Sequence, residues 1–129
     1  MDTLEFVRVR ELEVAVRIWN PSAPRTLIAW HGLARHGGDF SALARELGSE
    51  WRILAPANDY LYSHYVTVAI ALLDHFKLDH VDWLGTSMGG LLGMLIAADS
   101  EHSARISRLI LNDVGPELNK QGLIALSSY

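Results

Sequence analysis

Ser87 stands at the centre of a pentapeptide that places a hydroxyl group between two glycines. Residues 85–89 read Gly-Thr-Ser-Met-Gly and fit the pattern G-x-S-x-G. A serine hydroxyl attacks an acyl carbon when a base takes its proton and nearby N–H groups stabilise the resulting oxyanion. The pattern alone is weak evidence, because at average glycine and serine usage a random chain of this length contains one about one time in twenty-five. Its value therefore depends on the elements around it.

The elements around the pentapeptide are those of a nucleophile elbow. Residues 81–84 predict a buried strand, and the residues from about Gly90 onward predict a helix. A strand-to-helix turn of this kind is so tight that side chains at positions 85 and 89 would collide, so Gly85 and Gly89 are required. The helix N-terminus also directs N–H groups and the positive end of its dipole toward an anion formed beside Ser87. The alternative is a glycine-rich turn with an incidental serine.

A second segment supports the catalytic interpretation. His31, Gly32 and Leu33 directly follow the apolar run 26–30, at the carboxyl edge of the same predicted sheet. A loop in this place supplies one N–H donor to an elbow. The backbone N–H groups of Leu33 and Met88 are therefore the predicted oxyanion donors. On the alternative interpretation, this segment is a strand-ending turn with a satisfied histidine.

Strands and helices alternate along the chain, which predicts an α/β fold with a parallel sheet. Period-two alternation over residues 12–18, with residues 6–9 as partner, predicts a hairpin. The other predicted strands are the apolar runs 26–30 and 53–55 and the strand-like segments 81–84 and 106–111. The predicted helices are 40–47, with Asp39 as its cap and Gly48 as its end, a helix from about 63 to 76, and 91–98. On the longer helix, the predicted buried face carries Val66, Ala69, Ile70, Leu73 and Phe76.

Composition excludes several classes of function. The 129 residues suffice for one domain, and half of them are hydrophobic with a fifth charged, as in a soluble globular protein. The net charge of -4 lacks the basic stripe of a nucleic-acid-binding protein, and neither a secretory signal nor a membrane span is visible, so we expect a cytoplasmic protein. The absence of cysteine excludes disulfides and thiol catalysis. We expect neither a metal site nor a cofactor.

The chain resembles the N-terminal portion of the α/β-hydrolase superfamily, in its esterase-like serine hydrolase branch. The resemblance rests on residues 31–33, 84–90 and 111–116. It implies about six of the eight strands of that fold, and hydrolysis of an ester or related acyl bond in a small molecule. The serine at the elbow argues against dehalogenases and epoxide hydrolases, which use an aspartate there. Esterase, lactonase, carbon–carbon hydrolase and perhydrolase activities all stay open.

The sequence departs from the family where the rest of the catalytic triad is expected. In this fold the order is serine, acid, histidine, and family members are about twice as long, so their histidine and acid fall beyond Tyr129. His102 is the one histidine after Ser87, and a helix of this length carries it roughly 20 Å away. Asp113 follows the last predicted strand and is a candidate acid, or a turn residue before Gly115 and Pro116.

The resemblance therefore predicts a partial domain over residues 1–129, in which residues 117–129 start a cap helix. The loop over residues 56–60 is also shorter than in relatives. Two hypotheses follow: a serine hydrolase, or a catalytically inactive truncated relative that acts as a binding fragment. The strand 106–111 would expose an apolar edge, which predicts self-association.

Overall fold

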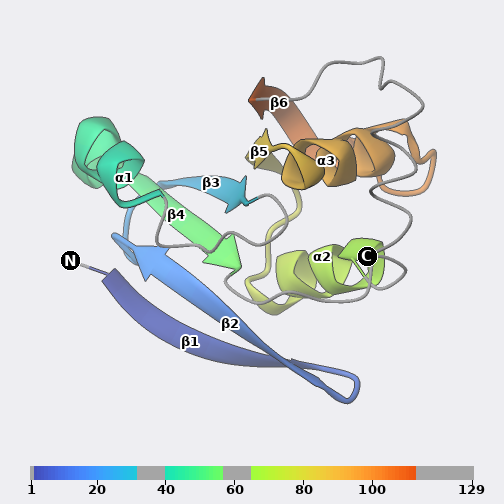
Figure 1. The fold of residues 1–129 in the computed structure, drawn as a ribbon, viewed down its shortest axis with the longest axis horizontal. Coiled ribbons are helices and arrows are strands. Elements are labelled where there is room, and N and C mark those ends of the chain that lie inside the picture. The colour runs from blue at the N-terminus through green and yellow to red at the C-terminus, as the bar shows by residue number, and fades with distance from the viewer. Residues whose placement is uncertain (1, 32–39, 57–64, 113–129) are drawn as a thin grey trace.

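A six-stranded sheet organises the computed structural model, which describes residues 2–31, 40–56 and 65–112. The strand order is β1-β2-β4-β3-β5-β6 (Figure 1). The strands are β1 (Asp2–Val9), β2 (Leu12–Trp19), β3 (Arg25–Trp30), β4 (Trp51–Pro56), β5 (Val81–Thr86) and β6 (Ile106–Asn112). β1 pairs with β2, and β2 with β4, in antiparallel fashion, whereas β4, β3, β5 and β6 are mutually parallel. The α/β class is confirmed, and β3 lies between β4 and β5, as the hydrolase fold predicts.

Helices cover the two faces of this sheet unequally. The helices are α1 (Ser41–Leu47), α2 (Tyr65–His75) and α3 (Met88–Ala98), with short 3-10 turns η2 (Gly48–Glu50) and η4 (Ser103–Arg105). α2 and α3 pack on one face and α1 packs on the other (Figure 1). In the described part of the chain, no helix has the length and apolar character needed to cross a membrane.

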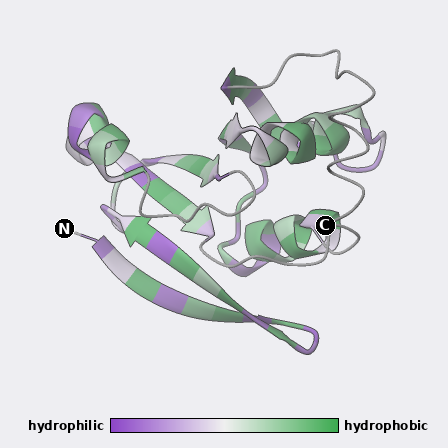
Figure 2. Ribbon diagram, viewed as in Figure 1, coloured by the Kyte–Doolittle hydropathy of each residue, from purple (hydrophilic) through white to green (hydrophobic). Residues whose placement is uncertain are grey.

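The main core lies between the sheet and helices α2 and α3. It forms because alternate residues of each strand face the same way, as Val14, Val16 and Ile18 do in β2. In Figure 2 the mostly hydrophobic ribbon of β2 is interrupted by a hydrophilic band, as expected where alternate residues face away from the core. The largest side chains of the core, each less than 2% exposed, include Trp30, Trp83, Tyr65, Leu54, Leu73, Leu92 and Ile96.

A smaller cluster lies beneath α1. It contains Trp19, Leu27, Ala29, Phe40, Ala44, Ile53 and Ala55. Phe40 occupies the N-cap position of α1 and no side chain caps the helix there, while Asp39, the predicted cap, lies outside the described residues. The helix ends as predicted at Gly48, which adopts φ 74° and donates its N–H to the carbonyl of Ala44.

The buried face of α2 differs from the sequence expectation. The structure buries Tyr65, Val68, Ala69, Leu72 and Leu73, whereas Val66, Ile70 and Phe76 are only partly buried at the edge of the core. The prediction was right for Ala69 and Leu73 and included three residues that are only partly buried, because this helix is apolar around most of its circumference. Periodicity then gives no single stripe from which to choose the core face.

Candidate active site

Ser87 alone forms the turn between β5 and α3. β5 ends at Thr86 and α3 begins at Met88, so one residue reverses the chain direction. Ser87 adopts φ 54° and ψ -116°, a conformation that costs a residue with a side chain about 1–3 kcal/mol. Its side chain is exposed. This strained, outward-facing serine is the geometry that the G-x-S-x-G pattern predicts.

Main-chain hydrogen bonds hold Ser87 on both sides. Its N–H donates to the carbonyl of Asn112, at the end of β6, over 2.9 Å. Its carbonyl accepts from the N–H groups of Gly90 and Leu91, at 2.9 and 3.1 Å. These bonds offset the backbone strain by fixing Ser87 to the neighbouring strand and to the helix. Asn112 was not a sequence candidate, because a main-chain acceptor leaves no signature in residue types.

Gly85 and Gly89 are required for different reasons. A Cβ atom at Gly85 would lie 2.4 Å from the carbonyl oxygen of Gly89 and from the main chain of Gly90. A Cβ atom at Gly89 would instead lie 2.1 Å from the carbonyl oxygen of Trp30, at the end of β3. At Gly85 the main chain of the same turn leaves no room for a side chain. At Gly89 the main chain of the neighbouring strand β3 leaves no room, a contact that the sequence pattern does not reveal.

The first turn of α3 and the end of β3 meet at this point. Met88 is the first residue of α3, so its N–H is among those with no acceptor in their own helix. His31 directly follows β3, and its carbonyl oxygen would lie 3.0 Å from a Cβ atom at Gly89. Gly32 and Leu33, the other predicted members of this segment, lie outside the described residues. The chain therefore enters the predicted oxyanion loop beside the elbow.

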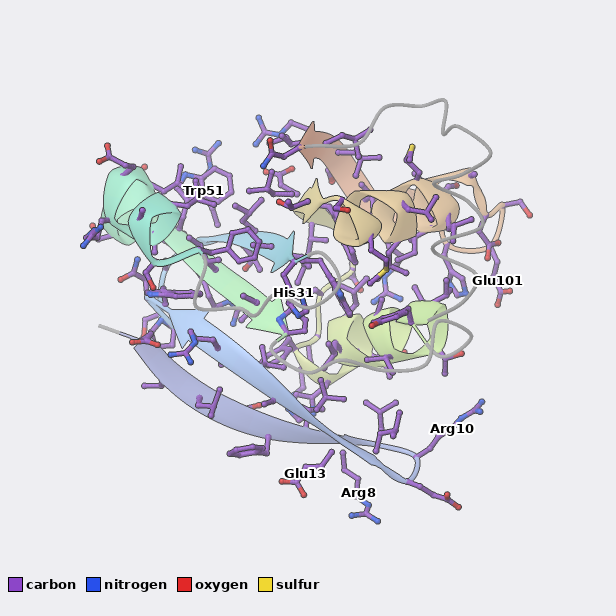
Figure 3. The ribbon with its side chains drawn as sticks, viewed as in Figure 1. Arg8, Arg10, Glu13, His31, Trp51 and Glu101 are labelled. Atoms are coloured by element: carbon purple, nitrogen blue, oxygen red, sulfur yellow. The ribbon has the colours of Figure 1, made fainter. Side chains whose placement is uncertain are left out.

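The described histidines do not supply an obvious base for Ser87. His31 is near the elbow but only 1% exposed, whereas Ser87 faces solvent. His75 pairs through Nε2 with Glu5 of β1 at 2.8 Å. His102 lies 3.9 Å from Glu101 beyond the far end of α3 (Figure 3, where His31 and Glu101 are labelled). The remaining described histidine, His80, lies at the opposite edge of the sheet.

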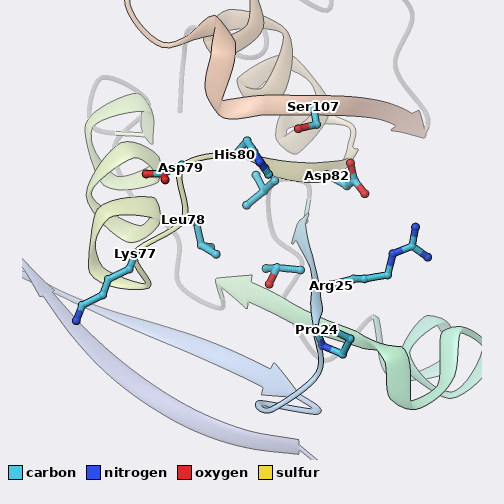
Figure 4. A pocket seen from close by; sticks show the side chains of 10 residues that line it. Pro24, Arg25, Lys77, Leu78, Asp79, His80, Asp82 and Ser107 are labelled. Atoms are coloured by element: carbon cyan, nitrogen blue, oxygen red, sulfur yellow. The ribbon is translucent and has the colours of Figure 1, made fainter.

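The edge opposite Ser87 carries a hollow of about 470 Å³ (Figure 4). It is lined at the amino ends of β3, β5 and β6, by residues that include Arg25, His80 and Ser107. Ligands of open α/β sheets bind at the carboxyl ends of the strands, which is the edge that carries Ser87. The hollow is therefore separate from the candidate site.

Among the described residues, no three His or carboxylate side chains are grouped as metal ligands are. Asp113, the candidate acid, lies outside the described ranges.

Comparison with known proteins finds hydrolases that share this fold, although no family model matches the chain. The chain is 36% identical to a 3-hydroxybutyrate-oligomer hydrolase of Cupriavidus necator, over 85% of this chain and 41% of that protein. An α/β hydrolase from Novosphingobium aromaticivorans superposes with a TM-score of 0.81 and 31% identity, over 99% of this chain and 50% of that one. The thioesterase domain from the curacin biosynthetic pathway, at 17% identity and a TM-score of 0.78, shares the fold.

The chain has the α/β-hydrolase fold and is similar in sequence to hydrolases of that superfamily. It spans about half the length of the solved structures it matches, and 41% of the curated relative. These similarities support a hydrolase in general.

Proposed function

We propose that the protein containing this chain hydrolyses an ester or related acyl bond of a small molecule, with Ser87 as nucleophile. The observation that carries this proposal is the backbone of Ser87, held at φ 54° with its side chain exposed at the start of α3. Ser87 Oγ attacks the acyl carbon and the alcohol leaves. Water then cleaves the acyl-serine to release the acid.

The backbone N–H groups of Met88 and Leu33 stabilise the oxyanion in this proposal. Met88 N–H is at the first position of α3, where the helix dipole adds to the hydrogen bond. His31 supports the loop that leads to Leu33, because it is buried beside the first turn of α3. Asp113 is the acid candidate within this chain, and the general base comes from a histidine other than the described ones.

The name of the curated relative indicates which substrates to test first. That protein is a hydrolase of 3-hydroxybutyrate oligomers, which are short chains of hydroxyacid units joined by ester bonds. We therefore propose short hydroxyacid esters as the first substrates for this protein. Dimers and trimers of 3-hydroxybutyrate, compared with a plain butyrate ester, would separate a hydroxyacid preference from general esterase activity.

The competing proposal is an inactive relative that binds a ligand without cleaving it. Its support is that no described histidine is both exposed and adjacent to Ser87. A serine hydroxyl without a base is a poor nucleophile at neutral pH. The oxyanion donors and the helix terminus nevertheless favour acyl transfer to Ser87 over transfer to an ordinary serine.

Site-resolved acylation distinguishes these two proposals within this chain. The chain is incubated with p-nitrophenyl butyrate, and butyrylated peptides are quantified by mass spectrometry over time. Ser103 and Ser107 are exposed serines outside the elbow and serve as internal controls. Since one oxyanion donor contributes roughly a hundredfold or more in rate, we expect Ser87 to be acylated at least about a hundredfold faster than Ser107. Equal rates at the two serines would contradict a nucleophilic role for Ser87.

A further inference from the structure

Two stacked indole rings lie directly beneath the elbow. Trp30 of β3 and Trp83 of β5 have ring centroids 5.5 Å apart and planes 8° apart. Tyr65, the first residue of α2, meets Trp30 edge-on at 6.3 Å. All three side chains are at most 1% exposed. Trp30 ends the strand that leads into the His31 segment, and Trp83 precedes Ser87 by four residues.

Trp83 is joined to the first turn of α3 by a hydrogen bond. Its indole N–H donates to the carbonyl oxygen of Gly89 at 3.1 Å, in a buried position. Gly93, one turn further along α3, leaves room for the ring: a Cβ atom there would lie 2.8 Å from Nε1 and Cδ1 of Trp83. The ring is thus held between the helix and the stacked Trp30.

Gly89 is the point at which the two tryptophans act together. Its carbonyl accepts the Trp83 indole N–H, while its Cα faces the main-chain carbonyl of Trp30 so closely that no side chain fits. The Trp83 side chain therefore fixes the first turn of α3 relative to β5. The close contact between Gly89 and the Trp30 main chain fixes the same turn relative to β3. β5 leads into Ser87 and the first turn of α3, and β3 ends at Trp30 beside that turn.

We propose that Trp83 is a positioning residue that fixes the Met88 N–H, in the first turn of α3, relative to the end of β3. It touches neither the substrate nor Ser87 Oγ and acts through Gly89. The inference rests on the proposed function, because it assigns a purpose to the geometry of that same site. Oxyanion donors work within a narrow range of distance, and a shift of about 1 Å in a catalytic arrangement can cost roughly a hundredfold in rate.

The variant Trp83→Phe tests this proposal, since phenylalanine keeps an aromatic ring but lacks the N–H donor. The measurement is the ratio of butyrylation rates at Ser87 and Ser107, taken at a temperature where each variant is folded by circular dichroism. We expect Trp83→Phe to lower this ratio by roughly tenfold or more. The matched control is Trp51→Phe, because Trp51 packs with the cluster under α1 on the other face. This variant should leave the ratio unchanged.

If Trp83 contributed only to stability, the ratio of butyrylation rates at Ser87 and Ser107 in the folded chain would be the same in Trp83→Phe as in wild type. A wild-type preference for Ser87 that persists unchanged in Trp83→Phe would overturn the positioning role alone. Absence of the preference in the wild-type chain would overturn the proposed function and the inference with it.

A second measurement needs no variant, in case Trp83→Phe fails to fold. Hydrogen exchange of the indole N–H groups is followed by NMR in the wild-type chain. We expect the indole N–H of Trp83 to exchange only when the whole chain unfolds. Rapid exchange of this N–H in the folded chain would overturn the proposal.

Discussion

The two faces of the sheet differ in how completely they are covered. On the face beneath α2 and α3, eighteen residues form one continuous buried cluster. On the α1 face the buried cluster is less than half that size. Three strand residues with large exposed hydrophobic side chains all lie on the α1 face by register: Leu4, Phe6 and Ile110, at 47%, 59% and 52% exposure.

The candidate site is built on the more completely covered face of the sheet. Trp30, Trp83 and Met88, which lie at the elbow, all belong to the buried cluster on the face beneath α2 and α3. The flanks of the α1 face instead carry ion pairs. Arg108 binds Asp82 through two hydrogen bonds, at 3.0 and 2.6 Å, and Arg17 binds Asp2. The candidate site is thus supported by buried apolar side chains, whereas the outer strands of the opposite face carry charged side chains.

The largest effect is expected at the contact between α3 and β3. Gly89→Ala would place a Cβ atom 2.1 Å from a main-chain oxygen of Trp30, and neither backbone can move without disrupting the elbow. We expect a loss of more than about 4 kcal/mol in the free energy of unfolding, which is exceptional for one substitution. Urea denaturation measures it. Leu95→Ala, at a half-exposed position of the same helix, is the control and should cost less than about 1 kcal/mol.

A matched pair of leucines compares the two faces directly. Leu54 of β4 is 1% exposed in the main core, whereas Leu4 of β1 is 47% exposed on the α1 face. We expect Leu54→Ala to cost about 2–5 kcal/mol, because it leaves a cavity among packed neighbours, and Leu4→Ala to cost less than about 1 kcal/mol. Urea midpoints of the two variants give the comparison. Similar losses in both would mean that the α1 face is covered more completely than its exposed side chains indicate.

The exposed apolar flank should also affect association. β6 is an edge strand of the described sheet, and Ile110 points outward from it. Such edges pair with other chains, so we propose that the chain self-associates there. Ile110→Lys should shift the species observed by size-exclusion chromatography toward the monomer. Leu95→Lys, at an exposed apolar position on α3, should not. A monodisperse wild-type monomer with a sharp thermal transition would contradict this proposal.

The smallest effect is expected at Asp2. The hydrogen bond from Arg17 holds the pKa of the Asp2 carboxyl below its usual value. A carboxyl whose pKa is lowered in the folded state stabilises that state above its unfolded pKa of about 3.9. The contribution is lost as the pH falls from there through the folded pKa. Asp2→Asn should therefore lower the urea midpoint slightly at pH 7, and the difference from wild type should shrink below about pH 4. A difference that does not change with pH would mean that the ion pair is not its cause.

Much of the fold was predictable because local patterns and global topology agree. The segments 26–30, 53–55, 81–84 and 106–111 each form a parallel strand. For 26–30 and 53–55 the signal was a continuous apolar run, because a strand covered on both faces is hydrophobic throughout. The elbow was predictable because Gly85, Ser87 and Gly89 are separated by fixed spacings along the chain. The strained φ of Ser87 is the physical reason for that pattern.

Features that depend on residues distant in the sequence were not predictable in this way. The acceptor for Ser87 N–H is a main-chain oxygen of Asn112, 25 positions further along, and any residue type could supply it. Gly89 is required by Trp30, which only the packed structure brings close. The buried face of α2 was only partly predictable because its apolar residues surround the helix, so the sheet rather than the helix sequence selects which of them are fully buried.

The central claim is that this chain carries the nucleophile, while none of the histidines that the structure describes is its base. The most direct test is the time course of p-nitrophenol release from p-nitrophenyl butyrate, for the wild-type chain and Ser87→Ala. We predict Ser87-dependent release of no more than one equivalent per chain, because an acyl-serine without a base is hydrolysed slowly. Sustained, saturable turnover that is lost in Ser87→Ala and also in His31→Gln, His75→Gln, His80→Gln or His102→Gln would contradict the account. It would place the base at one of the histidines that the structure describes.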